Sequence, residues 1–197
     1  MVLDFLSRIW FRFYLGILWA VCCIPIVTFG AATTAYCGML LRMKRGEEGY
    51  YTKGFFEIMK REWKQSTKVW GVMGALILVL YMDSKFISSL VNEYGGWYEG
   101  LVPVYYFLLI LVFGELLYVF PYIAMFENST RNVLKNSFLI STRHWGFTVT
   151  TMLMDGLLFW VMFRYVPGIV VIVPMILGWM NISMLYFVLR KYIVQNS

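Results

Sequence analysis

The sequence predicts an all-α integral membrane protein, in which residues 1–197 form a single bundle of helices with five to six membrane segments. Hydrophobic residues make up 60% of the chain, well above the roughly half that is usual in soluble domains. They gather in apolar runs of about 20 residues or more, the length that a lipid core of about 30 Å requires. Fifteen of the seventeen Lys and Arg residues, all except Lys85 and Arg164, can be placed on one side of a membrane, as is typical of cytoplasmic loops.

The first apolar run, residues 13–41, is longer than one crossing requires, because a helix rises about 1.5 Å per residue. Pro25 and Gly30 lie in its middle, and Pro removes a helix hydrogen bond, so we expect a break near Pro25. Two arrangements remain open: a kinked helix that crosses once, or a hairpin of two halves. The hairpin agrees better with the distribution of charge, because it keeps Arg8 and Arg12 on the cytoplasmic side.

The later membrane segments follow from apolar runs at 68–90, 101–126, 146–165 and 168–189. The loop 83–100 carries Asp83, Glu93 and Glu99 but only one basic residue, which indicates an external loop. The segments 42–68 and 128–145 are basic and are therefore expected on the inside. This order predicts a multi-pass protein of the lipid bilayer with a cytoplasmic C-terminus.

Two of the cytoplasmic segments are expected to form amphipathic helices in the head-group plane. One lies between Gly54 and Trp70 and the other near residues 131–145, and each combines a largely apolar or aromatic face with a basic face. In the second helix the expected apolar face consists of Leu134, Phe138, Ser141 and Trp145. Such helices lie on membrane surfaces. They either orient the bundle or dock a partner, and the candidate docking residues are Phe56, Met59, Lys60, Trp63, Lys64, Arg131, Lys135 and Phe138.

Small residues recur at every fourth position in two of the apolar runs. Gly30, Thr34 and Gly38 form one series, and Gly71 and Ala75 form the other. This spacing lets helix backbones approach closely in a membrane. It predicts a packing seam within the chain or an interface with another membrane protein, with Pro25 marking the break beside the first series.

Three polar side chains fall at similar depth in successive membrane segments: Glu115, Asp155 and Asn181. A charged side chain at the membrane centre costs about 2.5–3.5 kcal/mol, so each one needs a role there. They are candidates for an intramembrane site that binds a cation, a proton or a sugar hydroxyl. The structural alternatives are neutral carboxyl groups that hydrogen-bond between helices, or ion pairs with Arg12 or Arg164.

The sequence predicts no catalytic residue, no cofactor and no metal site, so we do not expect an enzyme. Cys22, Cys23 and Cys37 lie in the first apolar run without a histidine nearby, which favours a packing role. There is no phosphate-binding motif, so any active transport must draw its energy from another subunit or an ion gradient. The formal charge of +6 is explained by lipid head groups and topology rather than by nucleic acid.

Several stretches resemble the YesL-like family of bacterial integral membrane proteins. They are residues 23–35, with the pattern Pro-x-x-Thr-x-Gly-Ala-Ala, and then 45–50, Phe55-Phe56, 64–67 and 134–138. The resemblance implies a protein of the bacterial cell membrane, from a family long classed as of unknown function. It also implies an association with carbohydrate uptake, often beside sugar importers of the ATP-binding-cassette type.

The resemblance and the helical pattern together favour a non-enzymatic accessory protein that binds the permease of such a sugar importer. Its membrane face and the helix between Gly54 and Thr67 are the expected contact surfaces. Two other functions remain open. The protein is alternatively a small transporter that acts alone through Glu115, Asp155 and Asn181, or a membrane regulator.

Overall fold

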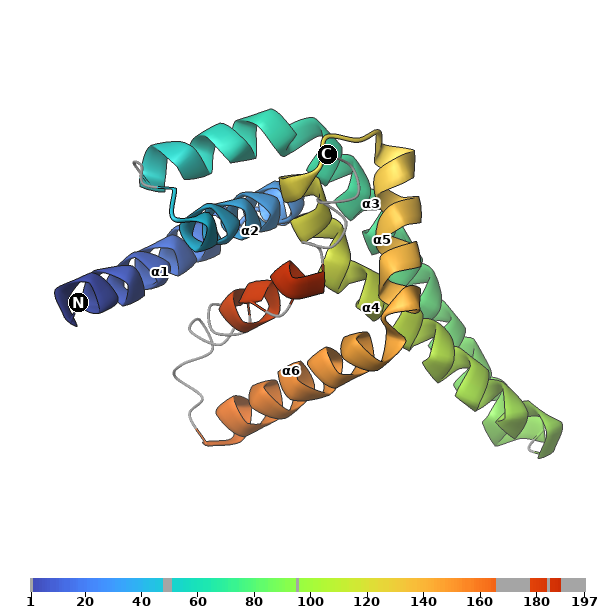
Figure 1. The fold of residues 1–197 in the computed structure, drawn as a ribbon. Coiled ribbons are helices and arrows are strands. Elements are labelled where there is room, and N and C mark those ends of the chain that lie inside the picture. The colour runs from blue at the N-terminus through green and yellow to red at the C-terminus, as the bar shows by residue number, and fades with distance from the viewer. Residues whose placement is uncertain (1, 48–50, 95, 166–177, 184, 189–197) are drawn as a thin grey trace.

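The computed structural model is all-helical over the residues that it describes, which are 2–47, 51–94, 96–165, 178–183 and 185–188. The elements in Figure 1 are α1 Val2–Cys22, η1 Ile26–Thr28, α2 Phe29–Arg45, α3 Tyr51–Tyr94, η2 Gly96–Gly100, α4 Leu101–Met125, α5 Thr130–Arg143 and α6 Trp145–Tyr165. Residues 178–183 and 185–188 are also helical and are called the last segment below. The rest of the predicted run 168–189, together with Arg190, Lys191 and the C-terminus, lies outside the described residues.

Three of the described helices are long and apolar enough to cross a membrane: Ile26–Arg45, Tyr51–Val91 and Leu101–Met125. Trp10–Cys22 and Trp145–Val161 are apolar but shorter. These findings agree with the predicted all-α class and with a membrane protein. The number of crossings and the side on which each terminus lies stay predictions.

The break predicted near Pro25 is present. Helix α1 ends at Cys22, and Pro25 adopts an extended conformation just before the short helix η1. The Thr28 hydroxyl donates hydrogen bonds to the carbonyl oxygens of Cys22 and Pro25. These bonds satisfy carbonyl groups that the end of a helix leaves without an intrahelical partner.

Helices α1 and α2 form an antiparallel hairpin rather than one kinked helix, and the position of this hairpin in the membrane stays a prediction. Trp19 contacts Tyr36 of α2, and Phe11 stacks on Tyr51 just beyond α2, so the two helices run antiparallel. The Trp19 indole also donates to the Thr33 hydroxyl at 3.2 Å. With 21 and 17 residues, the two arms are about 31 Å and 25 Å long.

If the hairpin crosses the membrane, a cysteine at Ser7 and one at Arg45 will be labelled from the same side. An impermeant thiol reagent, applied to each single-cysteine variant of a chain whose three native cysteines are replaced by Ala, tests this. Ile24→Cys, at the tip of the hairpin, is then expected to react from the opposite side. Labelling of Ser7→Cys and Arg45→Cys from opposite sides would contradict the hairpin, and labelling of all three from one side would place it on the membrane surface.

Helix α3 joins the predicted surface helix and the following membrane segment into one helix of 44 residues. At about 1.5 Å per residue it is about 66 Å long, roughly twice the thickness of the lipid core. In Figure 1 it runs along α2 and then turns to run beside α4. The expectation of a separate helix over 54–70 was wrong, because no proline lies between Tyr51 and Tyr94 to remove a helix hydrogen bond.

The first series of small residues is the seam between α2 and the first half of α3. A Cβ added at Gly30 would lie 2.7 Å from the Ser66 carbonyl oxygen and 2.8 Å from the Trp70 Cβ. Thr34 and Ser66 share a buried hydrogen bond of 2.9 Å between their hydroxyl groups. Helix α2 therefore lies against the basic half of α3, which carries its lysines on the outer side.

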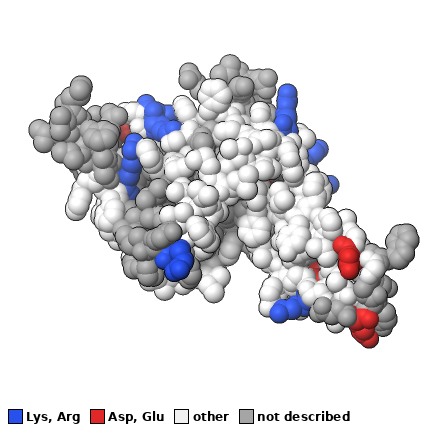
Figure 2. Space-filling model, turned by 90° about the horizontal axis from the view of Figure 1, so that it is seen from below, with Lys and Arg blue, Asp and Glu red and all other residues white. Residues whose placement is uncertain are grey.

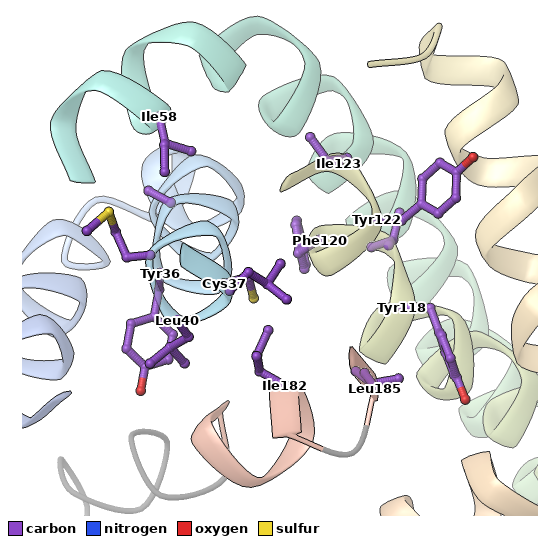
Figure 3. Packing of buried hydrophobic residues seen from close by; sticks show 14 of the residues in the cluster. Tyr36, Cys37, Leu40, Ile58, Tyr118, Phe120, Tyr122, Ile123, Ile182 and Leu185 are labelled. Carbon is purple, nitrogen blue, oxygen red and sulfur yellow. The ribbon is translucent and has the colours of Figure 1, made fainter. Parts of the chain in front are cut away.

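The hydrophobic core lies where α2, the first half of α3, α4 and the last segment meet (Figure 3). Its central side chains are apolar or aromatic and come from all four elements: Tyr36, Cys37, Leu40, Ile58, Phe120, Ile123, Ile182 and Leu185. The second half of α3 and the first half of α4 extend away from this core as a helical hairpin (Figure 1). Figure 2 shows acidic side chains at the far end of that hairpin, where Asp83, Glu93 and Glu99 are exposed.

Helix α5 lies along the second half of α4, and its buried face differs from the predicted one. The sequence placed Leu134, Phe138, Ser141 and Trp145 together, whereas the buried residues are Val133, Ser137, Ile140 and Ser141. Phe138 is exposed instead. The shift arises because Ser137 and Ser141 face Glu115 and Gly114 of α4, a polar and small-residue contact that apolar periodicity does not reveal.

Candidate functional site

A cavity of about 130 Å³ lies between α1, α2, α4 and the last segment. Its walls are mainly apolar and aromatic, and the lining residues are Trp19, Thr33, Tyr36, Cys37, Leu116, Leu117, Phe120, Pro121, Gly178, Asn181, Ile182 and Leu185. A few polar groups in an apolar surround are a feature of small-molecule sites, although most of those are larger, at about 300–1,000 Å³.

Local sequence features shape the walls of the cavity. A Cβ added at Gly178 would lie 2.6 Å from the Tyr36 ring, so only glycine lets the last segment approach α2 this closely. On the opposite wall, Pro121 lies inside α4 and has no N–H to donate to the Leu117 carbonyl four residues earlier. Both Pro121 and Leu117 line the cavity, which places this interruption of the helical hydrogen bonds at its edge.

Two of the three polar residues predicted to converge do meet. The Asn181 side-chain amide donates to Asp155 Oδ2 at 2.7 Å, which joins the last segment to α6. The remaining oxygens of the pair, Asp155 Oδ1 and Asn181 Oδ1, are buried and have no hydrogen-bond partner within the described part of the chain. Asn181 also lines the cavity, so the pair connects the cavity to α6.

Glu115 is not brought to this pair. It is buried on the face of α4 that meets α5, near the Ser137 hydroxyl, which itself donates to the Val133 carbonyl oxygen at 2.8 Å. Nearby, the Tyr118 and Thr148 hydroxyl groups share a hydrogen bond of 3.1 Å. The next residues, Leu116 and Leu117, line the cavity on another face of the helix. The three residues were predicted at similar depth in the membrane, but the Glu115 side chain points in a different direction from the other two.

The predicted docking residues on α3 lie on its outer side. Phe56 is 48% exposed and Trp63 is 37% exposed, Lys60 and Lys64 are exposed, and Met59 is half-buried. On α5, Arg131, Lys135 and Phe138 are exposed.

The buried face of α3 was not predicted from the sequence. It consists of Phe55, Ile58, Glu62, Ser66, Val69 and Met73. These residues recur at three-to-four-residue spacing, a pattern that indicates one buried face of a helix. The pattern was obscured because two of its members, Glu62 and Ser66, are polar.

The second series of small residues lies on the surface, whereas the first series is buried between helices. Gly71 and Ala75 are both exposed, and a Cβ added at Gly71 would meet no atom within 4 Å. Within the described residues, this series therefore contacts no other helix closely, although its spacing is the same as that of Gly30 and Thr34.

The hairpin and its seam with α3 lie in the part of the chain that is similar to a known family. Residues 13–84 match the model of DUF624, a protein family of unknown function. Comparisons with curated proteins and with solved structures gave no match.

The DUF624 match covers the second half of α1, all of α2 and α3 as far as Ser84. It includes Pro25 and the first series of small residues, from which the sequence resemblance was inferred. The finer resemblance to the YesL-like family and its link with carbohydrate uptake stay proposals. The walls of the cavity that come from α4 and the last segment lie outside the matched range.

Removal of the Tyr118 hydroxyl is expected to cost about 1 kcal/mol of stability, since a buried hydrogen bond between neutral groups contributes about that much. The variant Tyr118→Phe keeps the ring, which is fully buried between helices, and removes the hydroxyl that contacts Thr148. The free energy of unfolding in mild detergent checks this. The same change at Tyr106, an exposed ring, is the control and should have no effect.

Proposed function

We propose that the protein is a non-enzymatic membrane accessory protein that binds another integral membrane protein, the permease of a sugar importer of the ATP-binding-cassette type. The observation that carries the proposal is the near absence of partners for the second half of α3. Only 6% of the most apolar stretch of that helix is buried within the chain, compared with 44% for α4 and 61% for α2. The choice of a sugar importer rests on the resemblance to the YesL-like family.

The exposed side of α3 has the properties of a helix-packing surface. Gly71 and Ala75 lie one turn apart on it, and neighbouring large apolar residues are exposed: Val72, Leu76, Leu78, Val79, Met82 and Phe86. Lipid chains offer no hydrophobic gain for helix association, so membrane helices associate through close backbone contact at small residues. Contact with lipid is sufficient to explain why large apolar residues are exposed on α3. It does not explain the small residues on the same side, which favour contact with a helix of another protein.

The basic half of α3 offers a second contact surface. Helix α2 occupies its inner side, so Phe56, Lys60, Trp63 and Lys64 face outward. Aromatic residues and cations at the same membrane edge are suited to the cytoplasmic rim of a permease or to lipid head groups. We assign this surface an orienting role beside the main contact through Gly71 and Ala75.

Purification of the tagged protein from its native membrane in mild detergent, followed by mass spectrometry, tests the proposal. We expect stoichiometric recovery of sugar-importer permease subunits with the wild type. The double variant Gly71→Leu/Ala75→Leu should recover at least tenfold less permease, because its side chains prevent close helix contact. Gly156→Leu is the matched control, since Gly156 is exposed and also has open space around it on α6.

Three results would contradict the accessory role. The first is recovery of the protein alone as a defined homo-oligomer. The second is equal recovery of the permease by the wild type and the double variant. The third is a permease that assembles and transports normally in cells that lack this protein.

A transporter that acts alone is the second candidate function, and the cavity with its Asp155–Asn181 pair favours it. If this function is correct, proteoliposomes that contain only this protein will take up substrate. Asp155→Asn should then abolish uptake, whereas Glu115→Gln should retain it, because Glu115 faces α5 rather than the cavity. Uptake that is absent in the wild type, or equally lost in both variants, would count against a cavity-based transporter.

A further inference from the structure

Two cations from the two arms of the hairpin converge on the last segment. The Arg12 guanidinium carbon lies 4.7 Å from the centre of the Trp179 ring. The Lys44 ammonium nitrogen lies 5.5 Å from the centre of the Tyr186 ring. The two side chains are near enough for the charge of Arg12 to act on Lys44. Holding two like charges together is unfavourable, and an anion between them relieves that repulsion.

Lys44 differs from the other cations in the last turn of α2. Arg42 and Arg45 lie 3.9 Å and 3.8 Å from the carboxylate of Glu47. Lys44 has no carboxylate within ion-pair distance among the residues that the structure describes. Attraction to the helix C-terminus explains basic residues in this turn in general. It does not explain why Lys44 and Arg12 both lie over aromatic rings of the last segment.

The apolar cavity is lined by the same helix faces that carry these two cations. Arg12 lies seven residues before the lining residue Trp19 on α1, and Lys44 lies seven residues after the lining residue Cys37 on α2. Seven residues are about two helical turns, so each cation lies on the cavity side of its helix, about 10 Å along the axis. Tyr36, on the cavity wall, is also near enough to interact electrostatically with Arg12. Half of the lining residues are only half-buried: Trp19, Thr33, Leu116, Leu117, Gly178 and Asn181. The cavity is therefore reachable from the outside of the bundle.

We propose that this is a binding site for one anionic phospholipid, with its phosphate between Arg12 and Lys44 and part of one acyl chain in the cavity. The two cations complement the phosphate, and basic pockets between membrane helices hold anionic head groups in this way. The apolar walls complement an acyl chain, each buried methylene of which adds to the affinity. Free phosphate uses only the charged half of the site. The proposal is independent of the accessory role.

Lipid binding can be measured with the full-length protein in mild detergent. The readouts are the unfolding midpoint during titration with phosphatidylglycerol or phosphatidylcholine, and the number of lipids retained in native mass spectrometry. We expect phosphatidylglycerol to raise the midpoint and one molecule to be retained, with phosphatidylcholine and inorganic phosphate giving little shift. Lys44→Gln should weaken the apparent affinity about fivefold, and Lys44→Gln with Arg12→Gln about 25-fold.

Two further variants distinguish this site from general surface electrostatics. Lys85 also lies over an aromatic ring, that of Tyr81 at 5.7 Å, but it belongs to α3, which contributes no residue to the cavity. Lys85→Gln should therefore leave the affinity unchanged. Leu116→Phe keeps both cations and narrows the cavity, so it should reduce the preference for phosphatidylglycerol, and its midpoint without lipid reports on folding.

Several outcomes would overturn the proposal. Equal stabilisation by phosphatidylglycerol and phosphatidylcholine would show that charge is not recognised. Equal losses in Lys44→Gln and Lys85→Gln would show that only the overall charge matters. A shift with inorganic phosphate as large as that with phosphatidylglycerol would show that no acyl chain is bound. Lys44 is exposed, so Lys44→Gln should fold and decide the question even if the Arg12 variant does not.

Discussion

Replacement of Gly30 by Leu is expected to prevent stable folding, whereas the same replacement at Gly71 is expected to leave the fold intact. At Gly30 even a Cβ would clash with the backbone of Ser66 and with Trp70, at 2.7 Å and 2.8 Å. Overpacking typically costs about 1–3 kcal/mol, and contact with backbone places this case at or above the upper limit. At Gly71 the side chain enters open space, and helix propensity favours Leu by up to about 1 kcal/mol.

The pair of variants is compared by the yield of monodisperse protein and the unfolding midpoint in mild detergent. Gly30→Ala provides an intermediate step, because it adds only the Cβ that makes the closest contacts. A Gly30→Leu variant as stable as the wild type would mean that α2 and α3 are not in contact along this seam. Loss of folding in Gly71→Leu would mean that this side of α3 is covered.

Replacement of Asn181 by Leu is expected to lower the free energy of unfolding by about 1.5–3 kcal/mol, the usual contribution of a hydrogen bond to a charged group. The substitution removes the donor to Asp155 Oδ2. It leaves the Asp155 carboxyl group without that partner, although its other oxygen is already buried and unpaired. A polar group that loses its partner inside the protein costs more than the removal of both partners.

The double variant Asp155→Leu/Asn181→Leu is therefore expected to be more stable than Asn181→Leu alone. Asn136→Leu serves as the control, because the Asn136 amide donates to a neutral hydroxyl, that of Tyr122, at 2.9 Å. Its loss should cost only about 1 kcal/mol. A double variant less stable than both single variants would show that the two residues do not act as a pair.

The sequence identified most of the helices, although it divided α3 into two, but it did not identify which helices pack together. Apolar runs at 101–126 and 146–165 correspond closely to α4 and α6, and Pro25 marks the actual break. The spacing of Gly30 and Thr34 is the same as that of Gly71 and Ala75, yet one series is buried and the other is exposed. Helical periodicity shows which residues share a face, whereas the residues on that face do not show what covers it.

The candidate site was predictable in part for a similar reason. The depth of a residue in the membrane can be counted from the ends of its segment. Asp155 and Asn181 were predicted at similar depth, and their side chains do form a hydrogen bond. Direction around the helix axis changes by about 100° per residue, so Glu115 points to α5 while Leu116 lines the cavity. The cavity itself depends on the last segment reaching Tyr36 through Gly178, a contact between residues far apart in the sequence.

The continuity of α3 has a mechanical consequence. Large movements in proteins are usually absorbed by a few hinge residues in loops or at the ends of elements. No such loop separates the half of α3 that holds the hairpin from the half that is open on its outer side. A tilt of the outer half is therefore expected to shift Ser66 and Trp70, the residues of α3 that contact Gly30. A change of conformation in a bound membrane protein would in this way reach the contact between α2 and α3.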